Sequence, residues 1–493
     1  MKRSMWLFAL LAAVGAMPGA VAQQPSMQTV GVELKGDTLV YRTTSVPTRK
    51  GSGARACGWS TDEKLFALSK LWMEVRRNSA YLDRFGARRW DSLYRATIAP
   101  VMQSRDDPEF CRLLGDLCAQ LPGNQVFIIP RRNAPLTSIG YEGGWQLRLM
   151  DVGGHVVVCE VSADKASILP PGSEILSVNG QPVGEAMSRV LDRMPRRHAL
   201  KWLLYGPIGT PHEVEFRRPD GTRGSVQLVN PRYGSEPEMD TPVAALPGRS
   251  WKDLHEDFRL TWYPGDVACL KIGSFEPGQL FKAFHDALPE IRARARKLIL
   301  DLRFNGRGSD YMAAELISHL TRDTVLYGPL LRNRIYDAAL ASWGAWAEPG
   351  DTVRNSHVRF AYQLYNDEAF SEPKREAYRF PQNRGETLVV PTVILVNNAT
   401  GEAAETFLVF AASQPHMSIV GTTTSGDVGR RIRYSLLPGL PCYICVREVR
   451  LPDGSELAGR GIAPDIEVGE SLDDLLSGRD PMLEKALQIL GTE

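Results

Sequence analysis

The stretch at 391–431 constrains the fold of this chain more than any other part. An apolar run at 393–396 has the length of a buried strand, and a turn rich in Asn and Gly follows at 397–401. Apolar residues then recur at helical spacing over 404–411, and a second short strand ends at Gly421. A strand, a sharp turn and a helix in this order place the side chains of the turn at the helix N-terminus. Unpaired N–H groups and the positive end of the helix dipole gather at that point.

The surrounding block at 251–470 repeats this alternation of strands and helices. We expect a strand at 266–272, a helix at 279–297 and a buried strand at 298–302, with another helix starting near Tyr311. Such alternation predicts an α/β core with a mixed sheet.

The parts before this core differ from it in pattern. A capping box of Ser60 and Glu63 opens a region in which apolar residues recur at helical spacing. Short β-type runs separated by Pro-Gly and Asn-Gly turns follow at 140–232, and 231–250 has the composition of a linker.

The whole chain is therefore expected to be an α/β (α+β) multidomain protein. Its expected parts are a signal peptide (1–22), an N-terminal strand and linker (23–57), a helical unit (58–139), a β-rich domain (140–232), an α/β core (251–470) and a C-terminal helix (471–493).

The N-terminus has the three parts of a secretory signal. Lys2 and Arg3 precede a short apolar run, and Ala20-Val21-Ala22 is a small-x-small cleavage site. A transmembrane anchor is the alternative, but the run is short for a bilayer, and no later segment reaches ~18 unbroken apolar residues. We expect an exported protein, periplasmic or extracellular, without a transmembrane segment in the mature chain.

Composition narrows the classes of partner and cofactor. The net charge of +1 gives no argument for nucleic acid or an anionic membrane surface. Seven scattered Cys residues do not form a disulfide framework, and Cys442 and Cys445 are expected to be buried strand thiols. No pattern suggests zinc, and no cofactor is expected. The eight His residues lie outside recognisable catalytic motifs and are expected to be surface or structural: His155, His198, His212, His255, His285, His319, His357 and His416.

Four motifs together carry a family resemblance. They are LILDLRFNGRGSDY at 298–311, the strand–turn–helix that contains Glu405-Thr406-Phe407, LPDGSELAGRGIAPDIEV at 451–468 and PPGSEILSVNGQPV at 170–183. In this order they resemble the tail-specific (carboxyl-terminal processing) serine peptidase family. The likeness is strongest to its secreted bacterial branch, which is related to the tricorn core and the retinoid-binding protein repeats. The resemblance implies that 140–232 is a PDZ-like domain inserted before a peptidase core.

The positions that carry this family's chemistry are occupied by other residues. The resemblance places Glu402 where the family has its Ser, Asn124 where the branch has a His, and Asp427 where other members have a Lys. Arg307 replaces the middle Gly of the loop whose N–H groups would help bind an oxyanion, between Gly306 and Gly308. Acyl transfer requires a nucleophile and a base within hydrogen-bond reach, and the charge of Glu402 would oppose the oxyanion. Thr400 is the nearest hydroxyl and a candidate displaced nucleophile.

These substitutions predict a homologue with a degenerate active site. Its expected role is binding of peptides or proteins through the PDZ-like domain and the former cleft. Two alternatives stay open, so that the sequence does not decide whether the protein is an enzyme. The first is an active serine-type endopeptidase, and the second is a binder of lipids or other small ligands. The oligomeric state also stays open.

Overall fold

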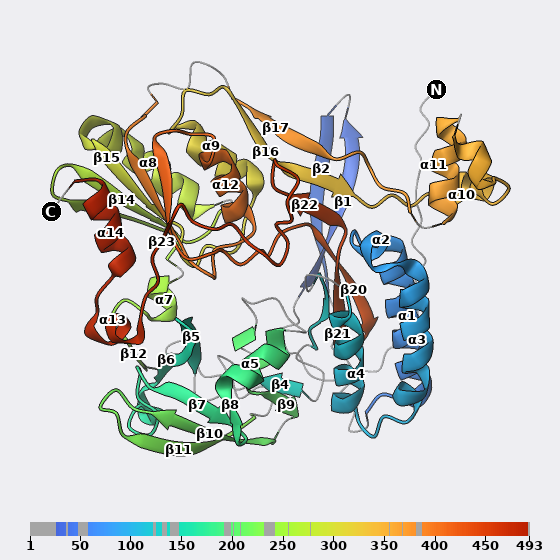
Figure 1. Ribbon diagram of the computed structural model, residues 1–493, viewed down its shortest axis with the longest axis horizontal. Coiled ribbons are helices and arrows are strands. Elements are labelled where there is room, and N and C mark those ends of the chain that lie inside the picture. Colours follow the sequence, from blue (N-terminus) through green and yellow to red (C-terminus); the bar gives the residue numbers. More distant parts are fainter. Residues whose placement is uncertain are drawn as a thin grey trace. The chain divides into compact units, whose positions relative to one another are not determined.

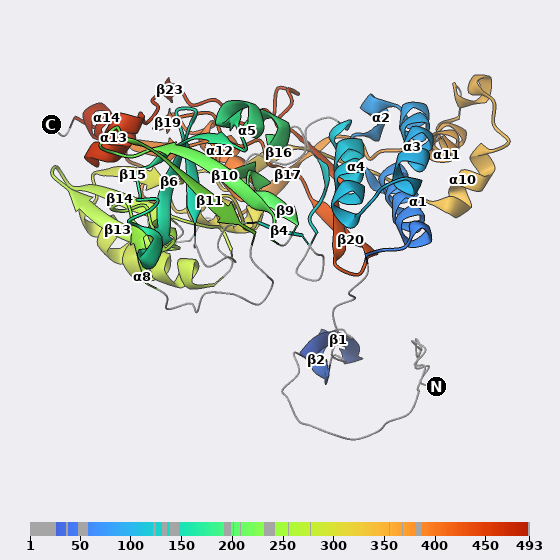
Figure 2. The same cartoon turned by 90° about the horizontal axis from the view of Figure 1, so that it is seen from below.

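The structure of the protein is a computed structural model, shown in Figures 1 and 2. It describes residues 26–35, 38–47, 58–121, 125–130, 136–138, 147–191, 199–200, 202–207, 209–230, 242–254, 256–276, 278–353, 355–366, 368–380 and 387–491. The chain divides into two compact units, Met1–Gly58 and Trp59–Glu493.

The first unit contains an antiparallel hairpin of β1 (Ser26–Lys35) and β2 (Thr38–Pro47). One strand and a linker were expected here, so the second strand is a correction. Residues 38–47 are rich in Thr and Val, which favour strands, and pairing with β1 satisfies their backbone groups.

The second unit begins with four helices: α1 (Thr61–Asn78), α2 (Leu82–Phe85), α3 (Ala87–Met102) and α4 (Asp107–Ala119). The predicted capping box of Ser60 and Glu63 is confirmed. The helices share a core with a three-stranded sheet, ordered β20 (Arg431–Leu437), β21 (Leu440–Cys445) and β3 (Val126–Ile128). Cys442 and Cys445 are buried free thiols on β21, as predicted.

A separate antiparallel sheet covers most of the β-rich region. Its strands are β5 (Arg148–Val152), β6 (His155–Ser162), β7 (Glu174–Val178), β8 (Gln181–Pro182), β10 (Pro211–Arg217), β11 (Arg223–Val229) and β12 (Val243–Ala245). Helix α5 (Val183–Leu191) follows β8, and β4 (Leu136–Ser138) pairs with β9 (Tyr205–Pro207). Strand β12 lies in the expected linker, and its residues 243–245 pair with β6 and are part of the sheet. The domain boundaries themselves stay predictions.

The central sheet is mixed, as predicted. Its order is β13 (Phe258–Tyr263), β14 (Val267–Ile272), β15 (Lys297–Asp301), β18 (Thr392–Val396), β19 (Met417–Gly421) and β23 (Ile466–Glu467). Only the β13–β14 pair is antiparallel among these. The four strands β14, β15, β18 and β19 are parallel, so their carboxyl ends meet along one edge.

Helices cover both faces of this sheet (Figure 1). The side chains of α8 (Gln279–Arg294), α9 (Asp310–Ser318) and α12 (Ala403–Ala411) form one apolar core with the sheet. The side chains of α14 (Pro481–Ile489) form a second apolar core on the other face of the sheet. The strand residues in this core alternate with those in the first, because successive side chains of a strand point to opposite faces. One C-terminal helix was expected, but α13 (Leu472–Ser477) ends at Gly478, which has φ 74° and breaks the segment in two.

An arm that the sequence did not predict extends from this core. Strands β16 (Val325–Asn333) and β17 (Lys374–Arg379) pair with each other, and β22 (Arg447–Arg450) joins β16. Between them the chain forms α10 (Ala338–Gly344) and α11 (Ser356–Tyr365), which pack together in Figures 1 and 2. Of the helices in the described ranges, none has the length and apolarity that a bilayer crossing requires.

Candidate functional site

The turn after β18 holds Glu402 in a strained backbone conformation. Glu402 precedes α12 with φ 51° and ψ −121°, and positive φ is rare for a residue with a side chain. Such strain costs on the order of 1–3 kcal/mol and persists only where the surroundings enforce it. A strained strand-to-helix turn of this kind presents a side chain at the edge of a sheet. The residue presented here is a glutamate, whose side chain is 28% exposed.

The carboxylate of Glu402 faces an arginine and does not cap α12. It makes no side-chain capping hydrogen bond, whereas Arg431 Nη1 lies 4.0 Å from Glu402 Oε1. The guanidinium of Arg431 also forms an ion pair with Asp427, and the backbone N–H of Glu402 donates to the carbonyl of Asp427 (3.1 Å). The structure thus brings together the two predicted positions at 402 and 427, and it adds an arginine that the sequence analysis missed.

The Asp427–Arg431 pair is buried. Their side chains are 2% and 9% exposed. Burial alone would lower the pKa of Arg431, but the acidic groups around it, Asp427 first among them, together outweigh burial and raise the pKa. Removing one partner of a buried pair leaves an uncompensated charge, so each member depends on the other. Asp427, which the resemblance placed where other members have a Lys, is therefore the partner of a fixed cation.

The predicted His position, Asn124, lies outside the described residues. Its neighbour Gln125 is 2% exposed, and Arg431 Nη2 donates to Gln125 Oε1 (3.4 Å). The ring of Phe127 lies 5.6 Å from the Arg431 guanidinium carbon. The segment after Asn124 therefore reaches the site and contributes an amide and an aromatic ring.

The predicted glycine loop lies against the turn that carries Glu402. The N–H of Gly401 donates to the carbonyl of Asn305 (2.9 Å), and a Cβ at Gly306 would lie 3.2 Å from the carbonyl of Ala399. Arg307 lies beside the acidic side chain of Glu276. Its Nε lies 3.6 Å from Glu276 Oε2, and its side chain is about half exposed.

Gly308 fixes the far end of this loop. It has φ 127° and forms a bridge with Phe275, and an added Cβ would lie 2.1 Å from the Phe275 carbonyl carbon. Only glycine fits this contact. The loop is therefore held at a defined distance from the carboxyl end of β14.

Thr400 is a buried structural hydroxyl. It is 0% exposed, donates to the carbonyl of Leu302 (2.9 Å) and accepts from the N–H of Asn397 (3.0 Å). These bonds join the two turns after β15 and β18. The geometry does not present this hydroxyl to a substrate.

Glu405 is a second carboxyl that the sequence analysis treated only as a motif residue. It is 0% exposed, and burial raises its pKa to about 8. Its Oε1 accepts from the N–H of Gly426 (2.8 Å) and from the hydroxyl of Thr424. Thr424 also accepts from the N–H of Ile462 (2.7 Å), so Glu405 ties α12 to the loop after β19 and to the closing segment.

The sequence of residues 266–468, which contains all of these loops, matches the family described as Peptidase family S41. This region belongs to peptidase family S41. No curated protein sequence matches the chain.

Solved structures resemble this chain over most of its length. Mature CPAF has a TM-score of 0.63 at 16% identity, covering 88% of this chain and 97% of that one. Mature CPAF complexed with lactacystin has a TM-score of 0.62 at 16% identity, covering 88% and 98%. The photosystem II D1 C-terminal processing protease has a TM-score of 0.47 at 17% identity, covering 87% and 98%. At 16% identity, the likeness to CPAF shows a common fold alone.

Proposed function

We propose that this protein is an exported S41 homologue that binds peptide or protein chains and does not cleave them. The observation that carries the proposal is Glu402 at the strained turn, facing the buried pair of Asp427 and Arg431. The family assignment of residues 266–468 supports peptides or proteins as the ligands.

The chemistry of the turn argues against acyl transfer. A carboxylate is a weak nucleophile, and its negative charge would destabilise a developing oxyanion beside it. Arg431 is held by Asp427 and remains protonated, so it does not supply a base. The turn therefore has the strained backbone that is typical of a nucleophile position, but the residue on it is not a good nucleophile and, among the described residues, has no base beside it.

An active serine-type endopeptidase is the second candidate function, because one further hydroxyl lies beside the turn. Ser425 Oγ accepts from the N–H of Asp427 (3.2 Å), and a Cβ at Gly401 would lie 2.3 Å from it. No hydrogen bond joins Ser425 to a histidine or lysine in the described part of the chain. Ser425 without a base would be a poor nucleophile.

The former cleft and the PDZ-like domain are proposed as the binding surfaces. A lipid-binding role would need an apolar pocket beside Glu402. Among the described residues, a groove of about 770 Å³ lies on the arm, away from Glu402, and is lined by residues such as Trp343, Trp346 and Val358. It gives no support for a lipid in the remodelled cleft.

Purified full-length protein tests the proposal. We expect no cleavage of an unstructured protein or of C-terminal peptides above background, and no labelling by a fluorophosphonate. Losing members of a catalytic triad typically costs ~10⁴–10⁶-fold in turnover. Glu402→Ser alone should also be inactive, because a base is still missing.

Two further variants identify the nucleophile if cleavage is observed. Cleavage abolished by Ser425→Ala would establish the second candidate function, and cleavage abolished by Thr400→Ala but kept in Thr400→Ser, with the fold intact by circular dichroism, would make Thr400 the nucleophile. Either result would refute the proposal. Peptide binding, measured by fluorescence anisotropy on a peptide library, should be the same in wild type and in Ser425→Ala.

A further inference from the structure

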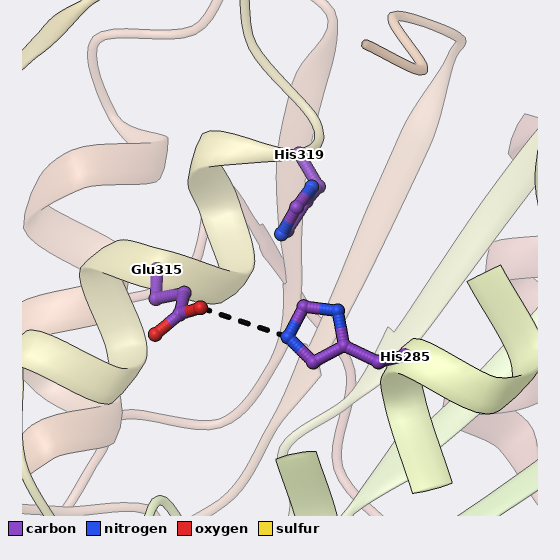
Figure 3. A group of neighbouring side chains, drawn as sticks. All are labelled: His285, Glu315 and His319. Atoms are coloured by element: carbon purple, nitrogen blue, oxygen red, sulfur yellow. Dashed lines mark ion pairs between the residues drawn. The ribbon is translucent and has the colours of Figure 1, made fainter. Parts of the chain in front are cut away.

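Two histidines and a glutamate converge at the end of α9 that is remote from the glycine loop. His285 lies on α8, Glu315 lies on α9, and His319 is the capping residue directly after α9. Figure 3 shows the three side chains directed toward one another, with an ion pair between His285 and Glu315. None of the three takes part in the site around Glu402.

The spacing of these groups is close to that of metal ligands. One ligand atom from each residue lies within 4.8 Å of the other two, and His285 Nε2 is 3.6 Å from Glu315 Oε1. Zinc bonds of about 2.0–2.1 Å in a tetrahedral site place ligand atoms roughly 3.3 Å apart. The His285–Glu315 pair already approaches this separation, and a contraction of roughly 1.5 Å at most would bring in the third ligand.

The fold holds one ligand rigidly and leaves the other two room to adjust. His319 is 6% exposed, and the N–H of Leu388 donates to its carbonyl (2.9 Å). The ring of Phe284 lies 5.7 Å from the rings of both His285 and His319. The side chain of His285 is 44% exposed and that of Glu315 is 20% exposed, so both can close on an ion by changes of rotamer.

Arg292 is in hydrogen-bond contact with His319. It lies two turns after His285 on α8, and its Nη2 is 3.3 Å from His319 Nδ1. Arginine only donates, so this bond uses the lone pair of Nδ1 and places the ring proton on Nε2. Once Arg292 moves away, the proton can transfer to Nδ1 and Nε2 can coordinate a metal.

We propose that His285, Glu315 and His319 form a binding site for one divalent transition ion of the zinc class, which displaces Arg292 from His319. Two imidazoles and one carboxylate favour zinc and its neighbours over magnesium or calcium, which prefer oxygen ligands. The exposed side of His285 leaves a fourth position for water. The ion would link α8 to the end of α9 and so stabilise the packing of these two helices on the central sheet. This inference is independent of the proposed function.

Zinc titration of metal-free full-length protein by calorimetry tests the site. We expect one Zn²⁺ per chain, with an affinity reduced at least ~10-fold in His285→Ala and in Glu315→Gln, as for the loss of groups around other metal sites. His357→Ala changes an exposed histidine on α11 and should bind like wild type. Arg292→Gln should bind several-fold more tightly, because the competing cation is absent.

His285→Ala and Glu315→Gln should keep the fold, since both side chains are partly exposed, and circular dichroism checks this. Zinc at 100 times its Kd should raise Tm by roughly 3–6 °C in wild type and not in His285→Ala. Absence of binding, or binding unchanged by His285→Ala and Glu315→Gln, would overturn the site. Equal affinities of wild type and Arg292→Gln would overturn the competition.

Discussion

At the scale of single residues, the buried carboxyl of Glu405 gives the molecule a pH-dependent stability. Its pKa of about 8 lies above its usual value of 4.5, mainly because burial disfavours the charged form. Between these values the native state holds a proton that the unfolded state has lost. Stability is therefore highest near or below pH 4.5 for this group, and it falls as pH rises toward 8, by up to about 1.4 kcal/mol per pH unit.

Glu405→Gln should remove this contribution. The amide keeps an oxygen that accepts from Gly426 and Thr424, and it does not ionise. We expect the midpoint of chemical unfolding to vary less between pH 5 and pH 9 in this variant than in wild type. Glu213→Gln alters an exposed glutamate on β10 and serves as the control. A pH profile of Glu405→Gln identical to wild type would contradict the assignment.

The residues of the site were only partly predictable. The strand–turn–helix pattern predicted the turn, and the resemblance to the tail-specific peptidase family placed Glu402 in it and Asp427 in the loop after the second strand. Arg431 was missed because it reaches back to Asp427 from the start of β20, and sequence spacing does not indicate such a turn. The preceding Arg430 differs in being exposed, and the sequence gives no sign of which arginine is buried. His285 and His319 were missed as a pair because they come from different elements. Glu315 and His319 are four residues apart, but the other histidine lies on α8, and sequence spacing does not show that the two elements meet.

At the scale of elements, Gly308 connects the loop after β15 to the chain after β14. Gly308→Ala should destabilise the protein by more than about 2 kcal/mol, since the new Cβ meets the Phe275 backbone at 2.1 Å and the φ of 127° is unfavourable for alanine. Gly350→Ala is the matched control, because a Cβ there meets no atom within 4 Å. It should change stability by no more than about 0.5 kcal/mol. Equal unfolding midpoints for the two variants would refute this view of the loop.

Elements with strong local signals were the ones that the sequence predicted. Strand β18 is a continuous apolar run and α1 carries a capping box, and both match their expected places closely. The arm of β16 and β17 was not predicted, because few of its strand residues are buried and the apolar signal is weak. The two strands also pair with each other across a segment that contains α10 and α11. Strand β3 was expected within a helical unit, but it pairs with β21 more than 300 residues away. Such partners are set by tertiary packing and not by local pattern.

At the scale of the whole molecule, the N-terminal helices depend on a hairpin near the C-terminus to bury their apolar side chains. The helices α1, α3 and α4 cannot bury their apolar faces among themselves alone, since their core includes Leu436, Leu440 and Ile444 from the β20–β21 hairpin. The chain must therefore reach residue 445 before this core is complete. We infer that a fragment ending before β20 would leave the helices with exposed apolar surface, although the helical pattern by itself reads as a separate unit.

Export is the prediction that concerns the whole chain. Lys2 and Arg3, the short apolar run and Ala20-Val21-Ala22 are the features that a signal peptidase uses, and they lie outside the described residues. Cleavage after Ala22 should give a mature chain beginning at Gln23. N-terminal sequencing of protein recovered from the native envelope or medium checks this, and Ala22→Pro, which disrupts the small-x-small site, should leave the precursor uncleaved. Recovery of a cytoplasmic chain that retains Met1 in the wild type would show that the segment is not an export signal. The free thiols of Cys442 and Cys445 would then reside in a reducing compartment, where they need no burial to stay reduced.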